Sequence, residues 1–410
     1  MSLRVAFFTG YFPLPSETFV LRQVLDLLTR GVDVQVFAAA PPPGAPRPQA
    51  WHEHALERRF HPRQAPTDPA GLALALARRV ARAPRSVQGA LGLASLRELG
   101  WRMRPSVPRA LSQLDLIAAG RFDVVHAHFG HWGVPLAALR ATQPKLRIVT
   151  TFHGYDVTVA PGLHGYGMYR RLFQVGDRFT VNSRYLWRRL IALGCPEDRM
   201  TQLRMGVSSS EFQCTPRRRT PGEPLRLISI GRLAPMKGFE YAISAVAELA
   251  RAGHDVRYRI VGDGELKSRL EAQIAQLGLG ERVTLLGALP HEAVRRELSS
   301  GHLFLLPSAY APAGQVETQG VVVQEAQASG LPVLVSQIGG VAEGMIDGET
   351  GFAFQPESPA AIVQAVEKAL SRERDWPEMG RRGRQLVEEL FDSQRLADDL
   401  LQIYQSISAR

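Results

Sequence analysis

The residues best suited to chemistry in this 410-residue chain are two glutamates, Glu317 and Glu325, which stand eight positions apart with Gly320 between them. They belong to the run E-T-Q-G-V-V-V-Q-E-A-Q-A-S-G-L-P-V-L-V at 317–335. A helix that begins at Gly320 directs its unpaired N–H groups, and the positive end of its dipole, toward an anion such as a diphosphate. Glu317 then stands just ahead of the anion, and Glu325 lies about two turns into the helix. The alternative is a surface helix with two solvated glutamates.

A loop with two cations is the second candidate. It begins at Gly231, ends at Gly238 and reads G-R-L-A-P-M-K-G, directly after an apolar run typical of a strand. Gly231 permits a tight exit from the strand, and Gly238 stands at the start of the next helix. Arg232 and Lys237 therefore lie near a helix N-terminus, where they can neutralise a diphosphate.

The next strand is followed by a second glycine turn, V-G-D-G-E-L at 261–266, which contains Gly262. It matches a dinucleotide-binding fingerprint only in part, because Lys267 replaces the third glycine. A plain strand-to-helix turn is the simpler interpretation, and an NAD-dependent oxidoreductase is disfavoured.

Polar residues also follow strands in the first half of the chain. His153 and Asp156 come at the end of the strand in T-T-F-H-G-Y-D. His153 is predicted to donate to a sugar hydroxyl or phosphate, with a packed histidine at a strand end as the alternative. Ser16 is predicted to cap a helix that continues through Glu17. Because they follow the Gly10 loop, both are expected at the mouth of a cleft.

Three histidines, His126, His128 and His131, lie in the run H-A-H-F-G-H. Alternate positions on a strand share a face, so these residues raise the possibility of a metal site. No cysteine or nearby carboxylate completes it, and no Asp-x-Asp pair, the usual device for holding a divalent ion against a diphosphate, occurs in the chain. We therefore expect no metal, and a diphosphate held by basic side chains and helix termini.

The elements that must position these residues alternate between strand and helix in two series. The first has strands at 3–9, 32–39, 124–128, 148–152 and 179–182, with helices at 17–30, 134–141, 169–175 and 183–193. The second has strands at 225–231, 257–261, 283–285, 303–306 and 333–335, with helices at 238–251, 266–277, 291–299 and 320–329. Such alternation predicts two doubly wound, Rossmann-like α/β domains with their loops around one cleft.

Domain limits follow from composition. We expect an N-terminal domain at 1–207, a polar and Pro-rich linker at 208–224, and a C-terminal domain at 225–390. A last helix at 391–410 is expected to pack back toward the N-terminal domain. The first domain carries an Arg-rich helical insertion at about 41–120.

Charge is concentrated in that insertion. The chain has a net charge of +10, and twelve arginines against four acidic residues lie between Pro46 and Arg109. Leucines interleave with the arginines, which favours contact with an anionic membrane surface, although a simply solvated arginine surface is also consistent. No finger, RNP-like or KH-type motif supports nucleic-acid binding. No signal peptide or apolar run of membrane-spanning length is apparent, and the two cysteines suit a cytoplasmic protein.

Together these motifs resemble family 4 retaining glycosyltransferases, which have the GT-B fold. The resemblance in the C-terminal half rests on G-R-L-x-x-x-K-G, V-G-D-G, L-P-S, E-x7-E, E-A-Q-A-S-G-L-P-V and G-G-V-x-E…D-G-x-T-G-F. The N-terminal half adds S-E-T-F, H-A-H-F-G, F-H-G-Y-D, N-S-R-Y-L and R-M-G-V. That set is similar to the branch that builds exopolysaccharides of the colanic acid and amylovoran kind. Ser208 departs from the family's usual aspartate, and Gln319 stands where many members have an aromatic residue, so Gln319 is expected to affect sugar preference.

The resemblance implies that the N-terminal domain binds the acceptor and that the C-terminal domain binds the nucleotide sugar. It also implies roles for individual residues. Arg232 and Lys237 would bind the donor diphosphate, Glu325 the ribose hydroxyls, and Glu317 and His153 the transferred sugar. The implied donor-binding set is Gly231, Arg232, Lys237, Gly262, Glu317, Thr318, Gln319, Gly320, Val321 and Glu325. The implied catalytic residues are Arg232, Lys237, His153 and Glu317, and the implied acceptor-side residues are Gly10, Ser16, Glu17 and Asp156.

The expected activity is metal-independent, retaining transfer of a sugar from a nucleoside diphosphate to a saccharide or polyprenyl-linked acceptor. It is expected in the cytoplasm or at the inner face of the plasma membrane. A nucleotide-sugar 2-epimerase of the same fold and a non-catalytic saccharide- or nucleotide-binding subunit remain alternatives. The intact Arg232, Lys237, Glu317 and Glu325 argue against the binding subunit.

Overall fold

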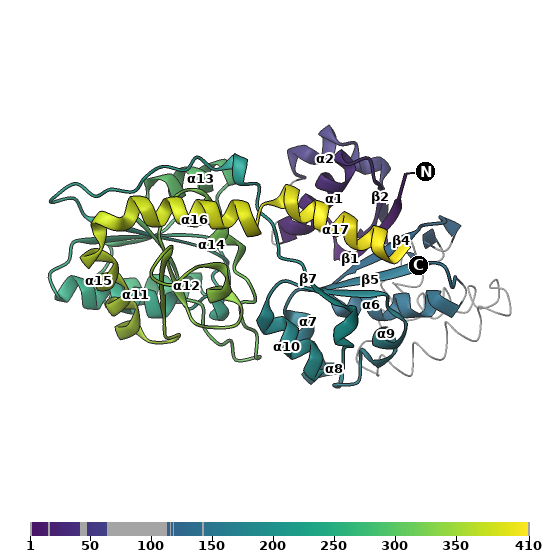
Figure 1. The fold of residues 1–410 in the computed structure, drawn as a ribbon. Helices are drawn as coiled ribbons and strands as arrows, with labels where there is room; N and C mark the ends of the chain where they lie inside the picture. The colour runs from purple at the N-terminus through teal and green to yellow at the C-terminus, as the bar shows by residue number, and fades with distance from the viewer. Residues whose placement is uncertain are drawn as a thin grey trace. The chain divides into compact units, whose positions relative to one another are not determined.

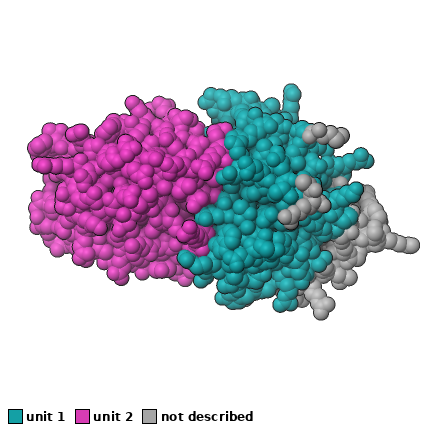
Figure 2. All heavy atoms as spheres, viewed as in Figure 1, with its two compact units in different colours: residues 1–182, 186–203, 397–410 teal, residues 183–185, 204–396 magenta. Residues whose placement is uncertain are grey.

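The chain divides into two units, each built on one parallel β-sheet (Figures 1 and 2). The computed structural model describes residues 2–14, 17–41, 47–63, 113–114, 116–117, 119–141 and 143–408. Unit 1 comprises 1–182, 186–203 and 397–410, and unit 2 comprises 183–185 and 204–396. Most of the Arg-rich stretch, and Ser16, lie outside the described residues.

Unit 1 contains a seven-stranded sheet in the order β3-β2-β1-β4-β5-β6-β7, in which every neighbouring pair is parallel. Its strands are β1 (Arg4–Tyr11), β2 (Asp33–Ala39), β3 (Phe60–Pro62), β4 (Val124–His128), β5 (Arg147–Phe152), β6 (Arg178–Val181) and β7 (Met200–Gln202). The order reverses between β1 and β4, so the loops after these strands meet at one edge of the sheet.

The described helices of unit 1 are α1 (Thr18–Thr29), α2 (Gln49–Glu53), α6 (Gly130–Leu136), α7 (Tyr155–Thr158), α8 (Ala160–His164), α9 (Arg170–Val175) and α10 (Arg184–Ala192), whose first two residues are grouped with unit 2. Helix α1 buries Val20, Val24 and Leu27, the helical spacing that places side chains on one face. It ends before Gly31, whose φ of 75° provides the left-handed conformation that closes a helix.

Unit 2 contains a six-stranded parallel sheet in the order β10-β9-β8-β11-β12-β13. Its strands are β8 (Leu225–Ile230), β9 (Val256–Val261), β10 (Val283–Leu285), β11 (Leu303–Leu306), β12 (Val333–Ser336) and β13 (Gly351–Phe354). Its helices are α11 (Phe239–Arg251), α12 (Lys267–Gln276), α13 (His291–Ser300), α14 (Val321–Ala328), α15 (Pro359–Ser371) and α16 (Trp376–Leu390), and it includes the first residues of α17 (Ser393–Ser408).

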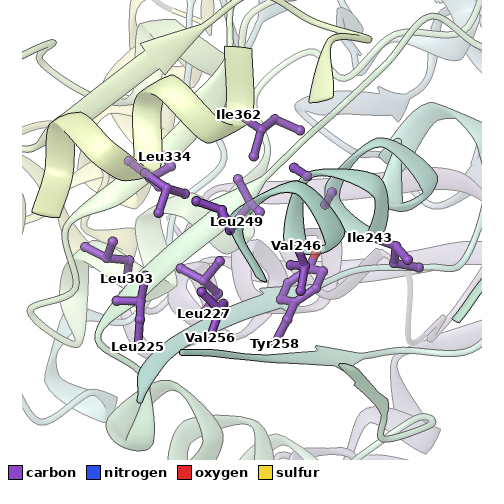
Figure 3. Close-up of a cluster of buried hydrophobic side chains, with 14 of the residues drawn as sticks. Leu225, Leu227, Ile243, Val246, Leu249, Val256, Tyr258, Leu303, Leu334 and Ile362 are labelled. Carbon is purple, nitrogen blue, oxygen red and sulfur yellow. The ribbon is translucent and has the colours of Figure 1, made fainter. Parts of the chain in front are cut away.

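Alternate strand residues of unit 2 point into two separate cores. Leu303 and Leu305 join the core formed with α11, α12 and α15, part of which Figure 3 shows. Phe304 and Leu306 join the opposite core, formed with α13, α14 and α16. Because helices cover both faces, the central strand β11 is apolar at every position, which is why the sequence shows a short continuous apolar run there. Unit 2 is therefore a three-layer α/β sandwich.

The structure departs from the sequence-based expectations in several places. The predicted linker at 208–224 lies within unit 2, where the guanidinium of Arg217 donates to the carbonyls of Ser299 (2.5 Å) and Ser329 (2.7 Å). The chain passes between the units before residue 204, ahead of the predicted linker, and residues 397–410 group with unit 1. The helix predicted at 134–141 begins at Gly130 and continues as a 3-10 helix over Ala137–Ala141.

Candidate active site

The loop after β8 in unit 2 presents the two predicted cations. It passes through a 3-10 turn at Pro235–Lys237 to Gly238, whose φ is 62°. A Cβ at Gly238 would lie 2.1 Å from the carbonyl oxygen of Pro307, so only glycine allows this approach. The side chain of Arg232 is exposed and, within the part of the chain that the structure describes, forms no hydrogen bond or ion pair. Its guanidinium is therefore available to a ligand.

The turn after β9 packs closely against this cation loop. Gly262 has a φ of 147°, and a Cβ there would lie only 1.9 Å from the carbonyl oxygen of Gly231. Gly264 is also left-handed in φ, and a Cβ there would lie 2.5 Å from the carbonyl oxygen of Leu233. The glycines of V-G-D-G thus allow two backbone loops to touch. Glycine is required at both positions because any side chain would clash with the neighbouring loop.

Helix α14 begins beside the cation loop. Its N-cap is Gly320, with a φ of 71°, and the preceding Glu317 forms an ion pair with Lys237. The two side chains are only 15% and 14% exposed, respectively. This pair brings together the two features that the sequence predicted separately, namely the cation loop and the positive end of a helix dipole.

The remaining predicted donor-side residues differ in accessibility. Glu325 and Val321 are half-buried, whereas Thr318 and Gln319 are buried. The side-chain amide of Gln319 accepts from the N–H of Met205 and donates to its carbonyl, both at 2.7 Å. Both polar atoms of the Gln319 side chain therefore bind a backbone peptide, and the expected effect of Gln319 on sugar preference stays a prediction.

In unit 1, His153 follows β5 and is buried to all but 9% of its surface. Its Nε2 lies 3.1 Å from Nδ1 of His128, and its ring packs against those of Phe19 and Phe129, with centroids 4.6 Å away in both cases. Burial, and secondarily the neighbouring His128, lowers the pKa of His153 well below its usual value. A neutral imidazole is therefore present at physiological pH.

His126, His128 and His153 form a row of stacked or tilted rings, which we call the histidine row. Burial lowers the pKa of all three, that of His128 to about 3. His126 uses Nδ1 to bind the hydroxyl of Tyr404 and Nε2 to bind that of Thr151, both at 2.6 Å. His126 thus has no ring nitrogen left for a metal, and no group of metal-binding residues occurs among the described positions.

The predicted acceptor-side residues are only partly brought together. Gly10 lies beside Trp132, whose Nε1 would be 3.1 Å from a Cβ at that position. Burial raises the pKa of Glu17 to about 7, and its Oε2 has no hydrogen-bond partner among the described residues. Asp156, predicted to face an acceptor, is instead fully buried and accepts hydrogen bonds from backbone N–H groups. Ser16 lies outside the described residues.

Two contacts in unit 1, made by Tyr404 and by Asp156, were not predicted from the sequence. Tyr404 on α17 completes the hydrogen bonding of His126, but the two residues are 278 positions apart in sequence, so no local pattern links them. Asp156 binds the loops after two neighbouring strands. A local signal exists only for the bonds to His153 and Gly154, since the carboxylate follows a strand–His–Gly turn and can reach back to open N–H groups. The bond to Gly130, which makes Asp156 a link between two loops, has no such signal.

Two parallel α/β units of this topology, one with a cation loop beside a helix N-terminus, define a GT-B glycosyltransferase. The chain resembles sucrose-phosphate synthase from Thermosynechococcus elongatus with a TM-score of 0.74 at 20% identity, over 99% of both chains. It resembles the Anabaena protein HepE, solved in complex with UDP-glucose, with a TM-score of 0.71 at 17% identity, over 98% of this chain and 99% of that one.

Sequence comparison assigns the family. The model of Glycosyltransferase Family 4 matches residues 16–211, and that of Glycosyl transferases group 1 matches residues 215–386. The chain is 31% identical to WcaL of Escherichia coli (strain K12), a glycosyltransferase named for colanic acid biosynthesis, over 99% of this chain and 100% of that protein. It is 32% identical to the amylovoran biosynthesis glycosyltransferase AmsK of Erwinia amylovora, over 90% and 91% of the two chains. The chain belongs to glycosyltransferase family 4 and is a glycosyltransferase.

Membrane association is a separate question from the fold. None of the helices that the structure describes is long and apolar enough to cross a membrane. The arginine-rich region on which the prediction of an anionic membrane surface rests lies largely outside the described residues.

Proposed function

We propose that this glycosyltransferase acts in the biosynthesis of a bacterial exopolysaccharide or other surface polysaccharide. It would transfer a sugar from a nucleoside diphosphate to a saccharide or polyprenyl-linked saccharide, with retention of anomeric configuration and without a metal ion. The names of WcaL and AmsK, which refer to colanic acid and amylovoran, support the assignment to polysaccharide biosynthesis.

The observation that carries the donor site is the ion pair of Lys237 and Glu317 at the N-terminus of α14. A diphosphate in this place would meet Lys237, the exposed Arg232 and the N–H groups at Gly320. Departure of the nucleoside diphosphate builds negative charge on phosphate oxygens, and fixed cations and N–H groups that meet this charge lower the barrier. Since these groups neutralise the diphosphate, no divalent ion is required. Anabaena HepE, a structural neighbour, is solved with UDP and with UDP-glucose.

Each remaining residue has a proposed task. Glu325, on α14, would accept hydrogen bonds from the ribose hydroxyls. Glu317 would position the sugar and hold Lys237. His153, kept neutral by burial, would contact a sugar hydroxyl without adding charge. The acceptor oxygen would attack the anomeric carbon on the face from which the diphosphate departs, and its proton would pass to the departing phosphate, so no protein nucleophile is needed.

The acceptor would bind near Gly10 and Glu17 in unit 1, with Ser16 beside them in sequence.

We also propose that the Arg-rich stretch contacts anionic lipid at the inner face of the plasma membrane, because this stretch contains twelve arginines and only four acidic residues. Flotation should recover more protein with anionic vesicles than with neutral ones at low salt. Equal recovery from both would remove the membrane proposal.

Release of nucleoside diphosphate from UDP-glucose, GDP-mannose and related donors, measured in EDTA, tests the transferase assignment. Slow hydrolysis of one donor without acceptor, yielding the sugar first as the anomer present in the donor, is the expected result. Proton NMR can identify this anomer before mutarotation. Activity that appears only with added Mg²⁺, or initial release of the opposite anomer, would contradict the proposal.

A further inference from the structure

Asp156 lies in the first turn of α7 and is fully buried, yet no cation faces its carboxylate among the described residues. Instead, three backbone N–H groups converge on it. Oδ2 accepts from Gly130 at 2.7 Å, and Oδ1 accepts from Gly154 at 2.8 Å and from His153 at 3.1 Å. Because a buried charge is stable only when it is well hydrogen-bonded, this carboxylate depends on all three donors, and they depend on it.

The three donors come from two different loops. Gly130 follows β4, whereas His153 and Gly154 follow the neighbouring β5. A single carboxylate therefore ties the backbones of the two loops that surround the imidazole of His153. Phe129 is on the first loop, and its ring lies 4.6 Å from that of His153.

The backbone at this junction is strained and needs such a tie. Phe129 has a φ of 71°, a left-handed conformation that is strained for a non-glycine residue. It is held on one side by its own N–H, which donates to Thr151 at 2.8 Å, and on the other by the bond from Gly130 to Asp156. Gly130 itself cannot be replaced without a clash, since a Cβ there would lie 2.1 Å from the ring of Phe152.

We infer that Asp156 is a positioning residue for glycosyl transfer. Its carboxylate fixes the loops after β4 and β5, and thereby holds the imidazole of His153 in the place where it meets the transferred sugar. This inference rests on the sugar contact proposed for His153. Asp156 itself touches neither donor nor acceptor, because its side chain is fully buried and its oxygens are occupied.

Asp156→Asn is the sharpest perturbation, because the amide keeps the shape and replaces one acceptor oxygen with a donor. That NH₂ must face at least one of the backbone N–H groups at Gly130, His153 and Gly154, and the tie between the loops fails. In the ligand-free protein, hydrogen exchange of these amides should accelerate about tenfold or more. Thr158→Val is the matched control, since it removes a side-chain bond to the carbonyl of Gly154 at 3.1 Å and leaves the carboxylate intact.

The kinetic result should separate positioning from general damage. For the donor that wild type hydrolyses among UDP-glucose and GDP-mannose, kcat should fall about 10- to 100-fold, as expected when a reacting group is misplaced by about 1 Å. The Kd for the corresponding nucleoside diphosphate should change less than twofold, since it binds through unit 2. Thr158→Val should keep both values within twofold of wild type.

A double-mutant cycle with His153→Ala shows whether Asp156 acts through the imidazole. The double variant should be no slower than His153→Ala alone. Losses that add, unchanged amide exchange, or a wild-type kcat in Asp156→Asn would each overturn the inference. Failure of the proposed function has a different signature, because His153→Ala would then turn over like wild type while the amides of Asp156→Asn still exchange faster.

Discussion

Lys237 has two expected roles, which are to bind the donor diphosphate and to neutralise the carboxylate of Glu317. Replacing Lys237 by methionine removes both, and their effects can be measured separately. The two side chains form an ion pair at 14% and 15% exposure, so methionine would leave the carboxylate of Glu317 nearly buried without its partner. Breaking a fully buried pair costs about 3–5 kcal/mol, and for this slightly exposed pair we expect about 2 kcal/mol. In a unit of this size that lowers Tm by about 4–8 °C in scanning calorimetry.

The same substitution should also slow the reaction. Loss of one fixed charge that meets the developing phosphate charge costs about 2–4 kcal/mol, which corresponds to about 30- to 1000-fold in turnover. Release of nucleoside diphosphate measures this loss. Lys267→Met, at the start of α12, is the matched control, since it removes a lysine from the same unit without touching Glu317. It should change neither turnover nor Tm appreciably.

The double variant Lys237→Met/Glu317→Gln decides between the two roles. With both charges removed, no nearly buried carboxylate is left without a cationic partner, so Tm should return to within about 2 °C of wild type. Turnover should stay as low as in Lys237→Met, because the cation for the diphosphate is still missing. Recovery of turnover in the double variant would show that the single variant failed only through the unpaired Glu317. It would then exclude a role of Lys237 in meeting the phosphate charge.

Further predictions concern packing and protonation. Gly262→Ala, whose Cβ would lie 1.9 Å from a backbone oxygen, should abolish nucleoside diphosphate stabilisation in a thermal-shift assay, whereas Gly280→Ala, whose Cβ meets nothing within 4 Å, should retain it. Gln319→Leu should cost about 1–3 kcal/mol in urea unfolding, because the bonds to Met205 are lost. Tyr404→Phe should cost a similar amount, because a ring nitrogen of the histidine row loses its partner, and an unchanged unfolding midpoint would contradict that network. The histidine row has pKa values below those of the unfolded chain, so its contribution to stability is full above pH 6.5 and falls as pH is lowered. The raised pKa values of Glu17 and Asp156 act in the opposite direction, but burial also lowers the pKa of His131 and that of His302 to about 4. The free energy of unfolding measured in urea should therefore fall as pH is lowered from 6.5 to 5.

The fold was largely predictable because the sheets are parallel and covered on both faces. Apolar runs such as 303–306 and 333–335 lie in β11 and β12, and Gly31 and Gly238 mark helix ends where positive φ is needed. Strands β7 (M-T-Q) and β13 (G-F-A-F) were missed, since neither is rich in the branched apolar residues that mark strands of similar length such as β11. The linker was misplaced because Arg217, in a polar and Pro-rich stretch, finds buried carbonyl partners that only the tertiary structure provides.

The site was predictable where chemistry depends on local spacing. Arg232, Lys237 and Glu317 follow strands or precede a helix, and parallel topology brings such loops together at one edge. The roles of Gln319 and Asp156 were not predictable in the same way. Both side chains are polar and follow functional motifs, but each binds backbone groups distant in sequence, so only three-dimensional contacts distinguish them from ligand-binding residues.

The central claim is that basic side chains and a helix terminus hold the donor diphosphate without a metal ion. Isothermal titration of UDP and GDP in EDTA, with wild type and with Arg232→Ala/Lys237→Ala, tests it most directly. One of the two nucleotides should bind wild type saturably in EDTA, and the variant should bind it about 100-fold more weakly or worse, since two charge-assisted contacts are lost. Binding that requires added Mg²⁺, or that survives loss of both cations, would show that these groups do not hold the diphosphate.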